Sequence, residues 1–187
     1  MDMKDIKSEP YESLNPNGRL PAIVDPNTDI TLFESGAILE YLVETYDKDA
    51  KLHYITSPEK FLTKSWLHLQ MSGQGPYFGQ RAWFGHLHPD KIPSAIERYG
   101  NEIKRVLGVI ERHLKKTGTD YLVGDKITYA DLAFVPWNVA VPWLMGDELN
   151  TEKDFPTFHA WHKRVTERPA VKKVLDDKNK AMAAARG

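Results

Sequence analysis

The 187-residue sequence contains no cysteine. That absence excludes a disulfide-linked scaffold, a cysteine-ligated zinc site and a protein thiolate nucleophile. An excess of one charge is also lacking, because 25 lysines and arginines face 26 aspartates and glutamates, which leaves a net charge of −1. Binding to nucleic acid or to a membrane surface requires a basic excess, so neither partner is expected. With no disulfide to form, the chain needs no oxidising compartment, and we expect a cytoplasmic protein.

A long apolar run is missing as well. The most apolar stretch, residues 132–145, contains Pro136, Asn138 and Pro142. It falls well short of the roughly 20 apolar residues that span a bilayer. The N-terminus is charged and shows no apolar segment of the kind found in secretory signals. These features predict a soluble chain that neither crosses nor binds a membrane.

Residues 1–47 are rich in turns and contain two short segments with β-branched residues. An Asn-Pro-Asn-Gly turn that ends at Gly18 precedes a predicted strand over residues 20–25. Four turn residues separate that strand from a second one over residues 30–33, so we predict a β-hairpin. From Glu34 the pattern becomes helical. The apolar residues that share one face of this helix are Ile38, Leu42 and Tyr46.

Residues 57–187 show helical patterns almost throughout, and residues 48–56 are interpreted as a linker. The most regular helix begins near Pro93, where apolar residues recur at intervals of three and four. Thr128 and Asp131 match the capping-box pattern at the start of another helix. We predict an all-α region of about five helices and a fold class of α+β that is mostly α. Expected bends and breaks lie at Gly73, Gly75, Pro136, Pro142 and Pro169.

Two places in the first region carry groups suited to ligand binding. A cis Leu20-Pro21 bond would turn the backbone N–H and C=O of Leu20 sideways, where an extended peptide can pair with them. The alternative is a trans proline that only starts a strand. Glu34 and Ser35 stand where the helix begins, and free N–H groups there favour a carboxylate. Ser35 either donates its hydroxyl to such a ligand, with Glu34 accepting from a ligand ammonium, or only caps its own helix.

Aromatic side chains and one arginine gather beside glycines between Gly73 and Phe84. Tyr77, Phe78, Arg81 and Phe84 are candidates for the lining of an apolar substrate pocket. The alternative is that they pack in the core of the helix bundle or at a subunit contact. No metal site is expected, because neither closely spaced pair of histidines has a third and fourth ligand nearby.

Several motifs, in their order along the chain, resemble the glutathione S-transferase superfamily. Residues 15–25 (NPNGRLPAIVD) and 32–38 (LFESGAI) look like the second half of its thioredoxin-like domain. Residues 128–133 (TYADLA) are similar to the folding signature of its all-α domain. Residues 75–80 (GPYFGQ), followed by Trp-Phe, resemble the fungal nitrogen-regulator-like group and its bacterial relatives. The resemblance covers nearly the whole chain.

The resemblance also implies a set of binding roles. Pro21 would follow a cis bond, and Leu20 would pair through its backbone with the cysteinyl part of glutathione. Glu34 and Ser35 would hold the γ-glutamyl end, and Lys7 would contact the glycine carboxylate. The aromatic segment would border the pocket for the second substrate.

At the level of function, the resemblance implies a glutathione transferase. Such an enzyme joins the glutathione thiolate to an apolar electrophile or reduces a disulfide or peroxide, with glutathione as co-substrate and no further cofactor. Residues 1–47 would form a partial thioredoxin-like glutathione-binding domain and residues 57–187 the all-α C-terminal domain. Family members are usually homodimers, so we expect the same here.

One departure from the family pattern concerns the N-terminal side. Family members begin with a strand–helix–strand unit, which takes roughly 30 or more residues, whereas 14 residues precede Asn15. We therefore expect the first strand, first helix and second strand to be absent, together with the residue that activates the glutathione sulfur. That predicts weak or no conjugation. Two alternatives stay open: a non-catalytic regulatory or dimerisation protein, and a truncated gene model.

Overall fold

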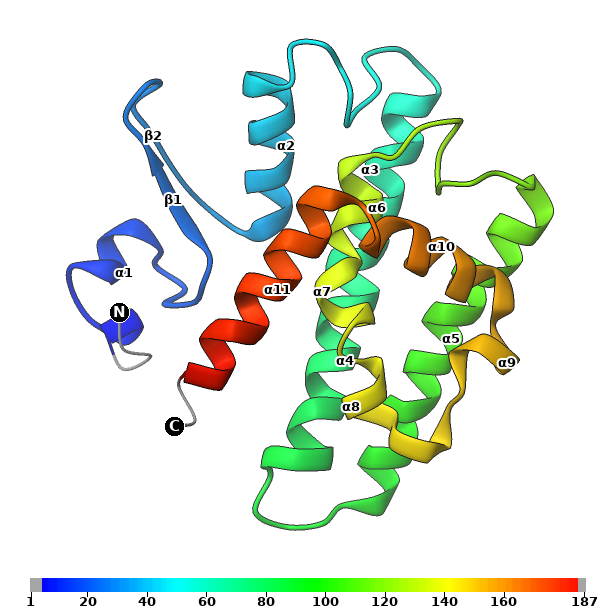
Figure 1. The fold of residues 1–187 in the computed structure, drawn as a ribbon. Coiled ribbons are helices and arrows are strands. Elements are labelled where there is room, and N and C mark those ends of the chain that lie inside the picture. The colour runs from blue at the N-terminus through cyan, green and yellow to red at the C-terminus, as the bar shows by residue number, and fades with distance from the viewer. Residues whose placement is uncertain (1–4, 185–187) are drawn as a thin grey trace. The chain divides into compact units, whose positions relative to one another are not determined.

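The computed structural model describes residues 5–184, and the chain divides into two compact units, Met1–His53 (unit 1) and Tyr54–Gly187 (unit 2). The division falls inside residues 48–56, the segment interpreted as a linker. Within the described residues, helices dominate and a single two-stranded sheet is present (Figure 1). The predicted fold class, α+β and mostly α, is confirmed.

Unit 1 is built on an antiparallel hairpin, which confirms the predicted pair of strands. Ala22 pairs with Phe33 at one end of the hairpin, and Asp25 pairs with Ile30 at the other. The preceding turn depends on Gly18, whose φ is +54° and whose added Cβ would lie 2.8 Å from a backbone carbonyl oxygen, so only glycine fits there. The elements are the 3-10 turn Asp5–Lys7, α1 (Tyr11–Leu14), β1 (Ala22–Asp25), β2 (Ile30–Phe33) and α2 (Ser35–Tyr46).

The helix α2 buries a different set of residues from the apolar face that the sequence predicts. Of that face, Ile38 is buried, but Leu42 and Tyr46 are 40% and 49% exposed. Gly36 and Val43 complete the buried side instead. The aromatic residue leaves the apolar side because its hydroxyl is bonded to the hairpin turn, as described below.

Unit 2 begins with a long helical arm that includes two π-helical segments, the first of them beside the glycines where the sequence predicts a bend. These segments are Gln70–Gln74 and Trp83–Leu87. The indole of Trp137 lies close to Gly75 and Gly79, within 4 Å of where a Cβ would stand on either, so small residues admit it there. The elements are α3 (Glu59–Leu69), α4 (Gly75–Ala82) and α5 (Pro93–Thr117), and α4 packs along α5 (Figure 1).

Unit 2 contains more helices than the five or so that the sequence predicts for residues 57–187, because its second half is divided into short pieces. Pro136 and Pro142 each stand in the first turn of a new short helix, because proline cannot donate the backbone bond that would continue the preceding helix. The elements are α6 (Tyr129–Ala133), α7 (Val135–Asn138), α8 (Val141–Met145), the 3-10 turn Gly146–Glu148, α9 (Thr151–Asp154), α10 (Pro156–Thr166) and α11 (Pro169–Ala184). Across residues 5–184, none of the helices has the length and apolar character needed to cross a bilayer.

The core of unit 2 contains a buried polar anchor. Thr128 and Asp131 form the predicted capping box. The same carboxylate accepts hydrogen bonds from the Leu122 N–H and the Trp161 indole N–H, both at 2.9 Å. Burial raises the pKa of Asp131, and the hydrogen bonds it accepts oppose that rise. The largest fully buried apolar side chains of unit 2 include Phe78, Ile103, Leu107, Ile110, Phe134, Phe158 and Trp161.

Candidate functional site

A candidate ligand site lies at one end of the unit 1 hairpin. The first residue of β1 pairs with the last residue of β2, so the residues that flank the two strands there leave the sheet together. Leu20 and Pro21 precede β1, and Glu34 and Ser35 follow β2. The strand register thus brings together four residues that the sequence singled out at two separate places.

The backbone turns a sharp corner at Glu34. Its φ of 69° and ψ of 115° lie outside the regions open to residues with a Cβ. Such a conformation costs about 1–3 kcal/mol and is found mainly at ligand clamps and active sites. The Glu34 side chain is exposed, and its carbonyl accepts the first helical bond, from the Ile38 N–H at 3.0 Å. Glu34 therefore forms the corner between strand and helix and keeps its carboxylate available.

Ser35 is the first residue of α2. Glu34 holds the capping position in front of it, so Ser35 is not the residue that caps the helix. The N–H groups of the first helical turn have no acceptor within the helix, and they carry part of the positive end of the helix dipole. The beginning of α2 is therefore suited to bind a carboxylate, with the Ser35 hydroxyl beside it.

The segment that leads to Leu20 is anchored by buried side chains. The Leu20-Pro21 peptide bond is cis, as the resemblance implied, and the Leu20 side chain is 56% exposed. The carbonyl of Arg19 accepts hydrogen bonds from the Tyr11 hydroxyl at 2.9 Å and from the Asn15 amide at 2.5 Å. Both donor residues are buried, so they hold the backbone next to Leu20 in one place.

Lys7 belongs to the turn that precedes this segment. Its ammonium donates to the carbonyl of Asn17 at 3.3 Å, and its stem lies over Gly18. The side chain remains exposed. Lys7 therefore places a cation on the turn. Among the contacts described, the partner of its ammonium is a neutral backbone carbonyl.

Sequence reasoning missed a polar cluster at the other end of the hairpin. Asp25 is buried, and its Oδ2 accepts a hydrogen bond from the Tyr41 hydroxyl at 2.6 Å and another from the Tyr46 hydroxyl. Its Oδ1 accepts from the Asn27 backbone at 2.9 Å, and Thr28 bonds to the Tyr41 hydroxyl. The bonds from Tyr41 and Tyr46 lower the pKa of Asp25 to about 2, and the bond to Asp25 raises the pKa of Tyr46 to about 12. Asp25 is the last residue of a strand that leads into a turn. Aspartate is common at such positions, so its presence there did not predict this cluster.

The aromatic segment of unit 2 divides between a half-buried ring cluster and the core. Tyr77 and Phe84 face Tyr99 of α5, with ring centroids 6.3 Å and 5.8 Å apart. Phe78 has no exposed surface and packs edge-on against Trp137. Phe78 is therefore a core residue, the alternative that the sequence left open, and it does not line an open cavity.

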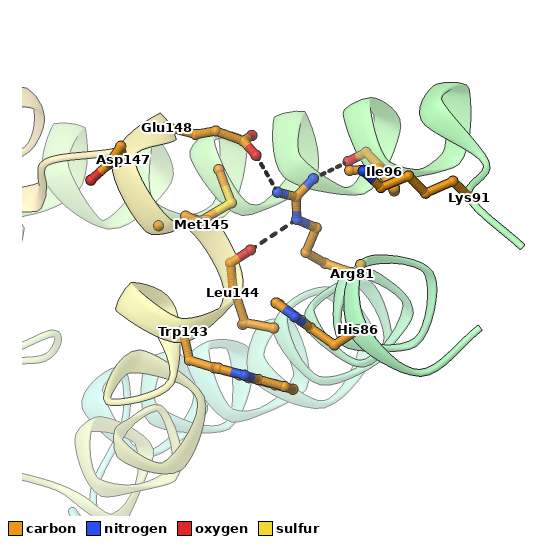
Figure 2. Close-up of a pocket in the computed structure, with 11 residues that line it drawn as sticks. Arg81, His86, Lys91, Ile96, Trp143, Leu144, Met145, Asp147 and Glu148 are labelled. Atoms are coloured by element: carbon orange, nitrogen blue, oxygen red, sulfur yellow. Dashed lines mark hydrogen bonds and ion pairs between the residues drawn. The ribbon is translucent and has the colours of Figure 1, made fainter. Parts of the chain in front are cut away.

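Arg81 is buried and joins three elements of unit 2. Its Nε donates to the Leu144 carbonyl at 3.0 Å, its Nη1 to the Ile96 carbonyl at 2.6 Å and its Nη2 to Glu148 at 2.5 Å (Figure 2). These bonds tie α4 to α5, to α8 and to the 3-10 turn that follows α8. With its charge paired and each of its three nitrogens donating a hydrogen bond, Arg81 acts as an internal brace.

A cavity of about 650 Å³ lies beside this brace. Trp143 and His86 stack on one side of it, with ring centroids 4.3 Å apart (Figure 2). The charges that line the cavity are balanced, because Lys91 and Asp147 are present together and the arginine is paired with a glutamate. The cavity therefore offers apolar surface but no net charge with which to select a ligand.

The histidines do not form a metal centre in the part of the chain that the structure describes. Within residues 5–184, no three histidine, aspartate or glutamate side chains gather closely enough to hold an ion. His162 stacks on Phe158 inside unit 2, and burial lowers its pKa to about 4. It is therefore neutral near pH 7 and acts as a core residue.

Comparison with known proteins finds two matching family models. A family model described as "Glutathione S-transferase, N-terminal domain" matches residues 1–44, and one described as "Glutathione S-transferase, C-terminal domain" matches residues 88–178. The glutathione S-transferase-like protein OpS6 of Beauveria bassiana is 51% identical over 179 residues, which cover 95% of this chain and 82% of that protein.

Two solved structures from Phanerochaete chrysosporium resemble the chain closely. The glutathione transferase URE2P6, in complex with oxidized glutathione, is 47% identical with a TM-score of 0.89, over 96% of this chain and 83% of that one. Ure2p5, cocrystallized with 1-(S-glutathionyl)-2,4-dinitrobenzene, is 44% identical with a TM-score of 0.87, over 92% and 80% of the two chains.

The chain belongs to the glutathione S-transferase family. Within that family, its similarity to the Ure2-type fungal proteins confirms the resemblance to the nitrogen-regulator-like group.

Proposed function

We propose that unit 1 binds glutathione at the Glu34 end of the hairpin and that the chain acts as a glutathione transferase. The observation that carries the proposal is the strained corner at Glu34. It places the positive beginning of α2 and an exposed carboxylate at the end of the hairpin where Leu20 also lies. A non-glycine residue in this conformation is a mark of a ligand clamp.

Each charged group of the tripeptide has a suitable partner in this arrangement. The γ-glutamyl carboxylate accepts from the Ser35 hydroxyl and from the first N–H groups of α2. The γ-glutamyl ammonium donates to the Glu34 carboxylate. The cysteinyl part pairs with the backbone of Leu20 in the manner of an added strand, and the glycine carboxylate takes the ammonium of Lys7 as its counter-ion.

The nucleophile in this proposal is the thiolate of glutathione itself, because the chain has no cysteine. The reaction is attack on an apolar electrophile, or reduction of a disulfide or peroxide by the same sulfur. Tyr77 and Phe84 present half-buried rings that suit an apolar second substrate. Arg81 and Phe78 are buried in unit 2, so we assign the substrate contact to the two half-buried rings.

The partner and location expected from the sequence remain part of the proposal. We infer a homodimer, and the exposed Phe61 and Leu62 of α3 are of the kind that interfaces cover. A reduced environment such as the cytoplasm suits a reaction that consumes a free thiol.

The binding step is tested by isothermal titration of glutathione into the wild-type chain and a Ser35→Ala variant. Loss of a hydrogen bond to a charged group costs about 1.5 kcal/mol or more, so we expect affinity to fall about tenfold. Ser65→Ala is the matched control, because Ser65 is an exposed helical serine of unit 2, and it should bind glutathione as the wild type does. No binding by the wild type, or unchanged affinity of Ser35→Ala, would overturn the proposal.

Catalysis is tested with 1-chloro-2,4-dinitrobenzene, followed by absorbance of the conjugate. We expect slow turnover that falls in parallel with affinity in Ser35→Ala, since none of the roles assigned above lowers the pKa of the glutathione thiol. Binding without any turnover would instead support a non-catalytic regulatory or dimerisation protein.

A further inference from the structure

The helix α2 runs back along the hairpin and is held at both of its ends. It begins at the Glu34 corner, beside the end where β1 starts and β2 finishes. Its twelve residues extend about 18 Å, longer than a strand of four residues, which spans about 13 Å. Its last turns therefore reach the opposite end of the hairpin, where Tyr41 and Tyr46 meet Asp25.

The far attachment consists of Asp25, Tyr41 and Tyr46, which we name the Asp25 clamp. One carboxylate oxygen accepts from both phenol hydroxyls, which are contributed by successive turns of α2. The other oxygen accepts from the backbone and side-chain amides of Asn27, at 2.9 Å and 3.0 Å. The carboxylate is buried and stays ionised at every pH above about 2. The clamp thus joins the hairpin turn to α2 by charge-assisted hydrogen bonds, which are short and directional.

We propose that Asp25 is a positioning residue: the clamp sets the direction of α2 and thereby aims its first turn, including Ser35, at the ligand. The inference rests on the proposed function, since it assigns Asp25 a role in the same glutathione site. Asp25 itself contacts no ligand in this scheme. It acts from the opposite end of the helix that carries the binding groups.

The apolar contacts of α2 do not fix its direction in this way. Ile38 and Val43 are buried beneath the helix, but apolar burial is non-directional and tolerates small rotations and tilts. The Glu34 corner joins the helix to β2 through a strained residue, whose relaxation would let the helix swing. A second, directional attachment at the far end removes that freedom.

The experiment compares Tyr41→Phe, Tyr46→Phe and the double variant by hydrogen–deuterium exchange and by glutathione titration. Each substitution removes one hydroxyl and keeps the ring. Tyr54→Phe is the matched control, because Tyr54 donates to Asp125 at 3.0 Å in unit 2, a tyrosine–aspartate bond outside the clamp. Should the double variant fail to fold, Tyr41→Phe alone carries the test.

A positioning role predicts that exchange of the first hydrogen-bonded amides of α2, beginning with that of Ile38, rises about three- to thirtyfold while the strands change less. A purely structural role predicts an equal rise in strands and helix. That equal rise, or no change at these amides of α2, would overturn the proposal.

Glutathione affinity of the clamp variants should fall by the same factor, with Tyr54→Phe at the wild-type value. Wild-type affinity in a folded double variant would also overturn the clamp's role. If the wild-type chain itself fails to bind glutathione, the proposed function falls, and the exchange pattern alone still decides whether the clamp aims the helix.

Discussion

Replacement of Glu34 separates the backbone cost of the corner from the binding role of its carboxylate. Glu34→Gly removes both the side chain and the conflict between a Cβ and a φ of 69°. Glu34→Ala removes the carboxylate but keeps the Cβ in the same conformation. The difference in stability between the two variants therefore reports the strain, less the cost of glycine's extra freedom in the unfolded chain. The loss of affinity that they share reports the carboxylate.

The size of each effect follows from the geometry. Release of the corner's strain returns about 1–3 kcal/mol, and the freedom of glycine in the unfolded chain takes back about 0.4–1 kcal/mol. We expect Glu34→Gly to be about 1 kcal/mol more stable than Glu34→Ala, which raises the melting temperature by about 2–4 °C in a chain of this size. Both variants should bind glutathione about ten- to hundredfold more weakly, because a hydrogen bond to a charged group contributes about 1.5–3 kcal/mol.

The assay is urea denaturation of the two variants, combined with glutathione titration. A glycine variant less stable than the alanine variant by about 0.4–1 kcal/mol would show that the corner stores no strain, and the main argument for a ligand clamp would then fail. Wild-type affinity in both variants would show that the Glu34 carboxylate is not a ligand contact, even if the strain is real.

Two further predictions concern the buried carboxylates. Ionised Asp25 stabilises the folded chain at pH values above the ordinary aspartate pKa. This stabilisation is lost as the pH falls towards about 2. The stability advantage of the wild type over Asp25→Asn should therefore shrink between pH 4 and pH 2, as acid unfolding followed by circular dichroism will show. Asp131→Ala should destabilise unit 2 by at least about 3 kcal/mol in urea, because the Leu122 amide, the Thr128 amide and the Trp161 indole lose a buried acceptor at about 1–3 kcal/mol each. A smaller loss would mean that water or another acceptor replaces the carboxylate.

Features that depend on neighbouring residues could be predicted from the sequence. The hairpin follows from turn chemistry between two β-branched segments, and the long helix from Pro93 follows from its regular spacing of apolar residues. The capping box of Thr128 and Asp131 is a local pattern as well. The π-helical segments could not be predicted in form, because their geometry depends on packing against other helices as well as on glycine. The short α9 went unnoticed for lack of any apolar period.

In the candidate site, too, local features could be predicted from the sequence and long-range contacts could not. Glu34 and Ser35 can be proposed from the sequence because the start of a helix is visible there, and the register of a short hairpin then places Leu20 at the same end. The Asp25 clamp could not be found, because Tyr41 and Tyr46 stand 16 and 21 residues along the chain from their acceptor. The helical periodicity counts these tyrosines as apolar residues, because it does not show which groups their hydroxyls bond to.

The strained backbone at Glu34 depends on the Asp25 clamp at the other end of α2. A residue held outside its favoured backbone region persists only where the surrounding structure over-determines it. The covalent link to β2 fixes one side of Glu34, and α2, held by Asp25 at its far end and by Ile38 beneath, fixes the other. If α2 could swing, Glu34 would relax, and the exposed carboxylate would leave the end of the hairpin where Leu20 lies. The buried aspartate at the hairpin turn is therefore part of what keeps the ligand-facing corner in its unfavourable, useful conformation.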